Sequence, residues 1–124
     1  LIALRKELDQ HIKILSGYRH VAYNDVLGGN RDSPHLQGKA VDIACHGKKA
    51  YNIIRLATEH GFTGIGVKQH GSKEDRFIHL DISNPSNLSI WSYKWSGWTL
   101  LKLLGPLCLH LFPLLLYWQR CILI

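Results

Sequence analysis

The sequence contains no methionine and only three cysteines among its 124 residues. An odd number of cysteines excludes a complete disulfide framework. Charged residues make up only 19% of the chain and hydrophobic residues 46%, a balance that excludes wholesale disorder and leaves room for one small globular domain. Because an initiator methionine is missing and residues 1–4 already have the pattern of a helix interior, we expect a part of a longer product, and no signal peptide can be read.

Acidic residues are absent after Asp81, although the chain as a whole carries a formal net charge of +6. Such a charge favours a polyanionic partner, for example a nucleic acid, an acidic cell-wall polymer or an anionic membrane. Up to Asp81, however, twelve basic residues stand against nine acidic ones, so this part carries only +3. It has no basic stripe with interleaved aromatic residues, the pattern typical of single-strand binders. The charge distribution therefore argues against nucleic acid as a partner.

The spacing of hydrophobic residues predicts an α+β domain with a small, largely antiparallel sheet and flanking helices. A density of glycine, asparagine, aspartate and proline predicts a long loop, and long loops in compact domains tend to carry function. The predicted elements are a helix over 1–10, a strand over 12–15, the loop over 16–34, a strand over 39–45, a helix over 48–60 that ends at Gly61, and strands over 62–67 and 76–82 joined by a hairpin over 68–75.

Two imidazoles and one carboxylate offer a set of metal ligands. The segment 33–42 reads Ser-Pro-His-Leu-Gln-Gly-Lys-Ala-Val-Asp, and His-Leu-Asp follows at 79–81. Catalytic zinc takes three protein ligands through nitrogen or oxygen and leaves a fourth position to water, and His35, Asp42 and His79 would supply that set. On spacing alone, these residues could equally be surface side chains or satisfied core groups.

Strand alternation places the candidate ligands on one face. In the strand over 76–82, His79 and Asp81 point to one side and the intervening aliphatic residues to the other. Asp42 lies between Val41 and Ile43 in the same way, so two neighbouring strands could aim Asp42 and His79 into one cleft. Asp81 then has a natural role as the hydrogen-bond partner of a ligating histidine.

The pair of motifs S-x-H-x-x-G-x-A-x-D and H-x-D closely resembles the zinc D-Ala-D-Ala carboxypeptidase family, which includes vancomycin-resistance peptidases and many phage endolysins. Supporting segments at 16–19, 24–33, 61–66 and 77–78 match as well, and the resemblance covers about residues 1–93. It implies a hedgehog/D,D-peptidase-like fold and a metallopeptidase that cleaves peptide bonds next to D-amino acids in cell-wall peptides. It also implies one zinc ion held by His35, Asp42 and His79.

The resemblance also bears on the residues that would act beside the metal. The family places an arginine in the segment that contains Arg19, where it holds the substrate near the scissile carbonyl. Several members use an acidic residue three positions before the second zinc histidine, but that position is Arg76 here. Glu74 and Asp75 are therefore our first candidates for the general base, ahead of His70.

From residue 94 the composition changes to a tail rich in tryptophan and leucine, so we predict a peptidase domain over 1–93 and a hydrophobic tail over 94–124. The stretch 98–118 has 21 residues, ten of them leucine, and as a helix would span about 31 Å, close to the roughly 30 Å of a bilayer core. Pro106 and Pro113 would interrupt such a helix, and Lys102 and His110 would place polar groups at depth in the bilayer. A membrane anchor, an artefact such as a shifted reading frame, and a packed appendage all stay open.

The leading hypothesis is a zinc peptidase acting on peptidoglycan stem peptides, either as a D-Ala-D-Ala carboxypeptidase or as a cross-link endopeptidase. We expect it in the cell envelope or periplasm, with 98–118 as a candidate membrane anchor, or encoded by a phage and acting on the wall. The alternative is a non-catalytic zinc-containing module that binds cell wall or protein, as in hedgehog signalling domains. A third reading, a membrane-tethered structural protein, predicts no bound metal.

Overall fold

The structure is a computed structural model that describes residues 1–94. Within it, a compact unit runs from Leu1 to Tyr93. The predicted hydrophobic tail, with its candidate membrane stretch 98–118, lies outside the described residues apart from Lys94. In the described part, no helix is long and apolar enough to cross a membrane.

In chain order the elements are α1 (Ile2–Leu8), β1 (Lys13–Ser16), α2 (Val21–Val26), the 3₁₀ helix η1 (Pro34–Gln37), β2 (Ala40–Ala44), α3 (Gly47–Glu59), β3 (Gly64–Lys68), the 3₁₀ helix η2 (Lys73–Asp75), β4 (Phe77–Asp81) and β5 (Ser89–Ser92).

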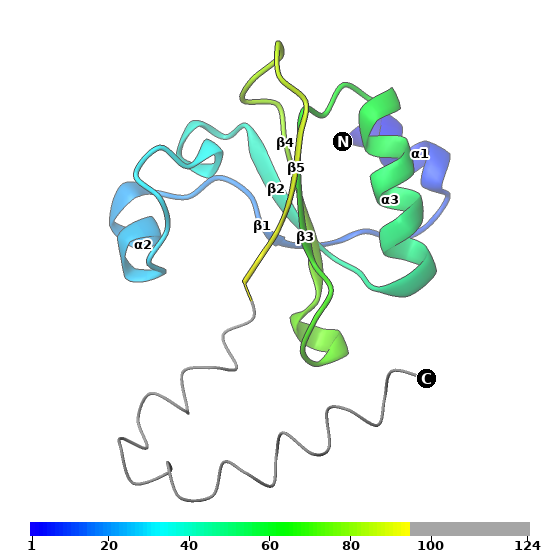
Figure 1. The fold of residues 1–124 in the computed structure, drawn as a ribbon, viewed down its shortest axis with the longest axis horizontal. Helices are drawn as coiled ribbons and strands as arrows, with labels where there is room; N and C mark the ends of the chain where they lie inside the picture. Colours follow the sequence, from blue (N-terminus) through cyan, green and yellow to red (C-terminus); the bar gives the residue numbers. More distant parts are fainter. Residues whose placement is uncertain (95–124) are drawn as a thin grey trace, which may run out of the picture. The chain divides into compact units, whose positions relative to one another are not determined.

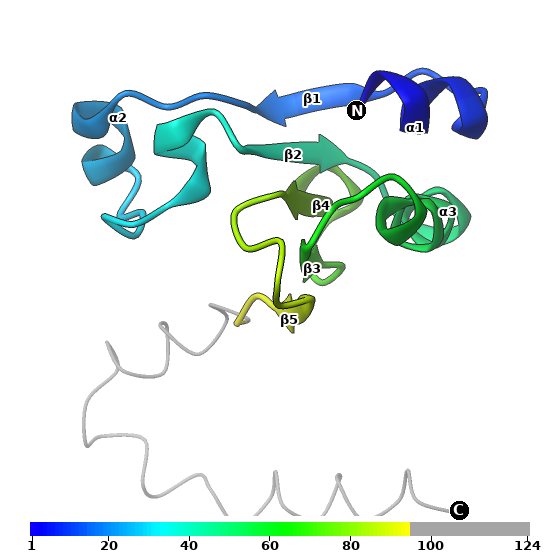
Figure 2. The ribbon, with the colours of Figure 1, turned by 90° about the horizontal axis from the view of Figure 1, so that it is seen from above.

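The five strands form one sheet in the order β1-β2-β4-β3-β5 (Figure 2). Every neighbouring pair is antiparallel except β3 and β5, which run parallel. The predicted α+β class with a largely antiparallel sheet is therefore confirmed. Strand β5 was not predicted, because the turn-forming residues before it and the tryptophans around it made this stretch look like the start of the tail.

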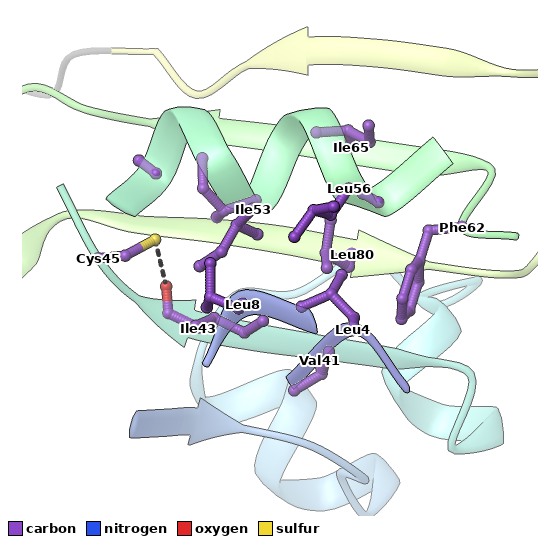
Figure 3. Close-up of a cluster of buried hydrophobic side chains, with 13 residues drawn as sticks. Leu4, Leu8, Val41, Ile43, Cys45, Ile53, Leu56, Phe62, Ile65 and Leu80 are labelled. Atoms are coloured by element: carbon purple, nitrogen blue, oxygen red, sulfur yellow. Dashed lines mark hydrogen bonds between the residues drawn. The ribbon is translucent and has the colours of Figure 1, made fainter. Parts of the chain in front are cut away.

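One face of the sheet carries the hydrophobic core, and α1 and α3 cover it (Figures 1 and 2). In α1 only Leu4 and Leu8 are buried, and Leu1, which precedes the helix, is 46% exposed. Cys45 lies in the core, and its thiol donates to the carbonyl oxygen of Ile43 (Figure 3). The other core side chains include Val41, Ile43, Ile53, Leu56, Phe62, Ile65 and Leu80 (Figure 3). Ile78 belongs to the same core.

Helix α3 follows its sequence pattern closely. Ala50, Ile53, Leu56 and Ala57 recur at helical spacing and are buried against the sheet. Gly61 directly follows the C-cap and has φ +76°, a conformation in which glycine has no steric penalty. The helix therefore ends within one residue of the predicted position.

The loop predicted over 16–34 contains one helix that the sequence reading missed. Of the turn-forming residues, Asn24 and Asp25 lie within the six residues of α2 and the others flank it, and the imidazole of His20 accepts a hydrogen bond at the N-terminus of the helix. Asn24 of α2 is fully buried and donates through Nδ2 to the carbonyl oxygen of Asn30 at 2.9 Å. This bond fastens α2 to the loop that follows it, on the side of the sheet away from α3 (Figure 1).

Candidate metal centre

The face of the sheet opposite the core brings together the three predicted metal ligands. His35 lies in η1, whereas Asp42 and His79 are directly opposite each other on β2 and β4. Because side chains alternate along a strand, the neighbours of Asp42 and His79 enter the core and these two polar side chains share the other face. The ligand atoms of His35, Asp42 and His79 all lie within 4.8 Å of one another, and all three side chains are buried.

The hydrogen bonds of the two histidines show which ring nitrogens face the centre. His35 Nδ1 lies 2.6 Å from the carbonyl oxygen of Gly17, and His79 Nε2 lies 3.2 Å from Asp81 Oδ2. A carbonyl oxygen can only accept, so His35 Nδ1 carries a hydrogen, whereas both nitrogens of His79 face a carboxylate, because its Nδ1 lies 2.8 Å from Asp42 Oδ1. In the tautomer of His79 that donates from Nε2 to Asp81, the lone pair is on Nδ1, which lies 3.2 Å from His35 Nε2, and both of these nitrogens face Asp42.

This arrangement fits a zinc ion. Two imidazole lone pairs and a carboxylate that converge on one point form the nitrogen and oxygen donor set of catalytic zinc sites. Two lone pairs cannot hydrogen-bond to each other, whereas a cation between them satisfies both. His35, Asp42 and His79 can therefore hold the metal, with each imidazole oriented by a partner on its far side.

Asp81 is the partner that orients His79. Its Oδ1 accepts from the backbone N–H of Ser83 at 2.9 Å and from the Ser83 hydroxyl at 2.5 Å, which leaves Oδ2 to the imidazole. Burial alone would raise the pKa of Asp81, but the bonds from Ser83 and His79 outweigh it and hold that pKa below its usual range. Asp81 thus makes the contact that its predicted role requires.

Arg19 lies beside the metal group rather than free in the cleft. Its Nη2 donates to Asp42 Oδ2 at 2.5 Å and its Nε to the Ser16 hydroxyl at 2.7 Å. Burial alone would raise the pKa of Asp42, but the hydrogen bonds and charges of His35 and His79 outweigh it and lower that pKa well below its usual range. The carboxylate is therefore kept ionised, as a metal ligand must be.

The three ligands open into a cleft of about 970 Å³, which Arg19 and Asp81 also line. Several residues that line the cleft were not identified from the sequence, among them Lys68, Trp91 and Tyr93. The ring of Trp91 lies 5.4 Å from the ring of His79, and the only sequence signal for Trp91 and Tyr93 was their alternation in the unpredicted strand β5 and its end. Burial and the charge of Asp42 raise the pKa of Tyr93, which keeps its phenol protonated.

The structure does not bring Glu74 and Asp75, the predicted general bases, to the cleft. Both lie on the exposed helix η2 in the hairpin, and Asp75 accepts a hydrogen bond from Ser72 at 2.9 Å. This hairpin precedes β4, and Asp75 is four residues from His79, about 13 Å along an extended chain. Arg76 faces back toward the hairpin and donates to the carbonyl oxygen of Gly71. His70, the third candidate, is also absent from the cleft walls in this part of the chain.

A comparison with protein families identifies one match. The sequence model of the family described as Peptidase M15 matches residues 1–81, which is more than half of the chain and includes all three candidate ligands. A search of curated proteins found no match.

Proposed function

Because the chain belongs to the peptidase M15 family of zinc-dependent metallopeptidases, we propose that it hydrolyses peptide bonds next to D-amino acids in peptidoglycan stem peptides. The observation that carries the proposal is the convergence of His35 Nε2, His79 Nδ1 and the Asp42 carboxylate at the wall of the cleft. When bound there, zinc supplies a Lewis acid for the scissile carbonyl and for the attacking water.

The protein's own groups position the metal ligands and the substrate. Asp81 keeps the hydrogen of His79 on Nε2, so Nδ1 stays available as a ligand. Arg19 uses Nε and one N–H of Nη2 in its bonds to Ser16 and Asp42, which leaves three of its five donors for a substrate oxygen. A guanidinium in this position stabilises negative charge that develops on a carbonyl oxygen during attack.

The size of the cleft supports a peptide substrate. Its volume of about 970 Å³ lies at the upper end of the range for small-molecule sites, roughly 300–1,000 Å³, and is large enough for several residues. The proposal therefore includes both a D-Ala-D-Ala carboxypeptidase and an endopeptidase that opens cross-links. Either activity would place the protein in the cell envelope or periplasm, or make it a phage-encoded enzyme that acts on the wall.

The test is to incubate the zinc-loaded full chain with purified muropeptides and to follow the products by mass spectrometry. We expect release of a terminal D-Ala, which identifies a carboxypeptidase, or opening of a cross-link, which identifies an endopeptidase. His79→Ala should abolish the product, because it removes a ligand. The matched control is His46→Ala, because His46 is exposed and makes no side-chain cap bond to α3. Absence of any product while zinc is bound would contradict the proposal.

A second candidate is a non-catalytic zinc-containing module that binds the cell wall or a protein. The position three residues before His79 holds Arg76, and the carboxylates of Glu74 and Asp75 lie outside the cleft, which favours this candidate. It predicts that the zinc-loaded chain sediments with insoluble peptidoglycan but releases no fragment from it. Product release in the assay above would exclude it.

A further inference from the structure

Lys68 is the one side chain that β3 sends toward the cleft. Residues opposite each other on antiparallel strands share a face, and the partners on β4 of Gly64, Gly66 and Lys68 are Asp81, His79 and Phe77. The two glycines leave space that other side chains fill: a Cβ at Gly64 would lie 2.0 Å from Asp81 Oδ2. Lys68 is therefore the position at which β3 adds a charge to the cleft.

The ammonium of Lys68 has an aromatic contact but no ionic one. Its Nζ lies 5.3 Å from the centroid of the Phe77 ring. The Phe77 ring in turn makes an edge-to-face contact with the ring of Tyr93. Within residues 1–94, Lys68 makes no ion pair, whereas Arg19, the other cation of the cleft, is paired with Asp42 at 2.5 Å.

The carboxylates of the cleft do not neutralise Lys68. Asp42 is held by Arg19 and both histidines, and Asp81 by Ser83 and His79. Asp32, the remaining acidic side chain of the walls, is exposed on the loop before η1, and no ion pair joins it to a residue of the described part. A half-buried ammonium on an aromatic surface, without a counter-ion, is well placed to take one from a ligand.

We infer that Lys68 binds a free carboxylate of the peptide substrate close to the scissile bond. This inference rests on the proposed function for the identity of the ligand. Lys68 is diagonal to His79 across the strand pair, and diagonal neighbours in an antiparallel pair lie about 7–8 Å apart. A carboxylate on its ammonium would thus lie within a few residues of the metal group, at about 3.5 Å per residue. The carboxylate belongs either to the terminal D-amino acid or to an acidic residue of the stem.

Binding is measured by calorimetry with the full chain treated with chelator, so that the peptide stays intact. The ligand is an acylated tripeptide that ends in D-Ala-D-Ala and has a free side-chain carboxylate and a free terminal carboxylate. It is compared with two other peptides, one amidated at the side-chain carboxylate and one amidated at the terminal carboxylate. We expect one of the two amidations to weaken binding to the wild type at least tenfold. In Lys68→Gln that dependence should disappear, and Lys68→Arg should restore it.

Lys73→Gln is the matched control, because Lys73 is exposed on η2 outside the cleft walls and the substitution removes the same charge. If terminal amidation weakens binding, Lys68 binds the terminal carboxylate. If side-chain amidation weakens binding, Lys68 binds the acidic residue of the stem. The inference is overturned if neither amidation weakens binding, or if Lys73→Gln has the effect of Lys68→Gln. Binding that follows these expectations without turnover in the zinc-loaded chain would contradict only the proposed function.

Discussion

Replacing Gly64 by alanine should disrupt the support of the metal group from the neighbouring strand. The added methyl would lie 2.0 Å from Oδ2, 2.5 Å from Cγ and 2.7 Å from Oδ1 of Asp81. Asp81 is only 3% exposed and its side chain is short, so it cannot swing aside without leaving its partners. Those partners are the Ser83 backbone N–H, the Ser83 hydroxyl and His79 Nε2.

The magnitude follows from the number of these bonds. A hydrogen bond to a charged group contributes about 1.5–3 kcal/mol, so the loss of two of the three costs about 3–6 kcal/mol. Replacing glycine by alanine restricts the unfolded chain and so adds at most about 1 kcal/mol to the free energy of unfolding. The clash costs more than this, so the net effect is destabilising. A domain of this size has roughly 5–15 kcal/mol of stability, and about 3 kcal/mol corresponds to a fall in Tm of about 12 °C or more.

The assay is thermal and urea unfolding of the full chain, with zinc affinity measured by competition with a chelating dye. We expect zinc to bind about 10–100-fold more weakly, because His79 loses the partner that orients it. Gly17→Ala is the control, since a Cβ there meets nothing within 4 Å. In an Asp81→Ala background the clashing atoms are gone, so Gly64→Ala should then cost less than about 1 kcal/mol. A Gly64→Ala protein with unchanged Tm and zinc affinity would refute the reasoning.

Three further predictions concern single side chains. Arg19→Ala should lower kcat/KM about a hundredfold or more in steady-state assays, because it removes the donors available to a substrate oxygen; an unchanged kcat/KM would show that Arg19 has only a structural role. Glu74→Gln and Asp75→Asn should each retain turnover within about twofold, because both residues lie outside the cleft, and a loss of kcat in either would restore it as a candidate base. Burial raises the pKa of the Cys45 thiol to about 11, so its neutral form dominates at pH 8, and mass spectrometry after brief alkylation should find Cys45 unmodified in the native chain and labelled in urea.

The sequence predicted the sheet well where one face of a strand is buried. In β2 and β4 the aliphatic residues alternate with Asp42, His79 and Asp81, and this period specified both the core face and the polar face. Helix α2 could not be found in this way, because it buries Asn24 and leaves Val21, Tyr23 and Val26 more than half exposed. A six-residue helix without an apolar face has no periodicity to detect.

At the candidate site, the sequence predicted the positions of side chains on paired strands better than the positions of side chains on loops. Asp42 and His79 lie opposite each other because β2 and β4 are neighbours in the sheet and each strand has one polar face. The positions of Glu74 and Asp75 depend instead on the path of a hairpin, and nearness in sequence to His79 was a poor guide because an extended strand separates them in space. The bond from His35 Nδ1 to the carbonyl oxygen of Gly17 is made by the backbone, so no side-chain pattern could have revealed it.

The glycines of β3 explain why the cleft has the composition it has. Gly64 admits Asp81 from one neighbouring strand, and a Cβ at Gly66 would lie 2.9 Å from the ring of Trp91 on the other. The cleft face of β3 therefore contributes space where β4 and β5 contribute side chains, until Lys68 adds the charge at its end. Because alternate residues of a strand share one face, the pattern Gly-x-Gly-x-Lys over 64–68 places two glycines and one lysine on the cleft face of β3. The glycines leave space for the Asp81 carboxylate and the Trp91 ring, and the lysine adds a positive charge. A substitution at either glycine should consequently alter the metal group and the aromatic wall before it alters the hydrophobic core on the opposite face.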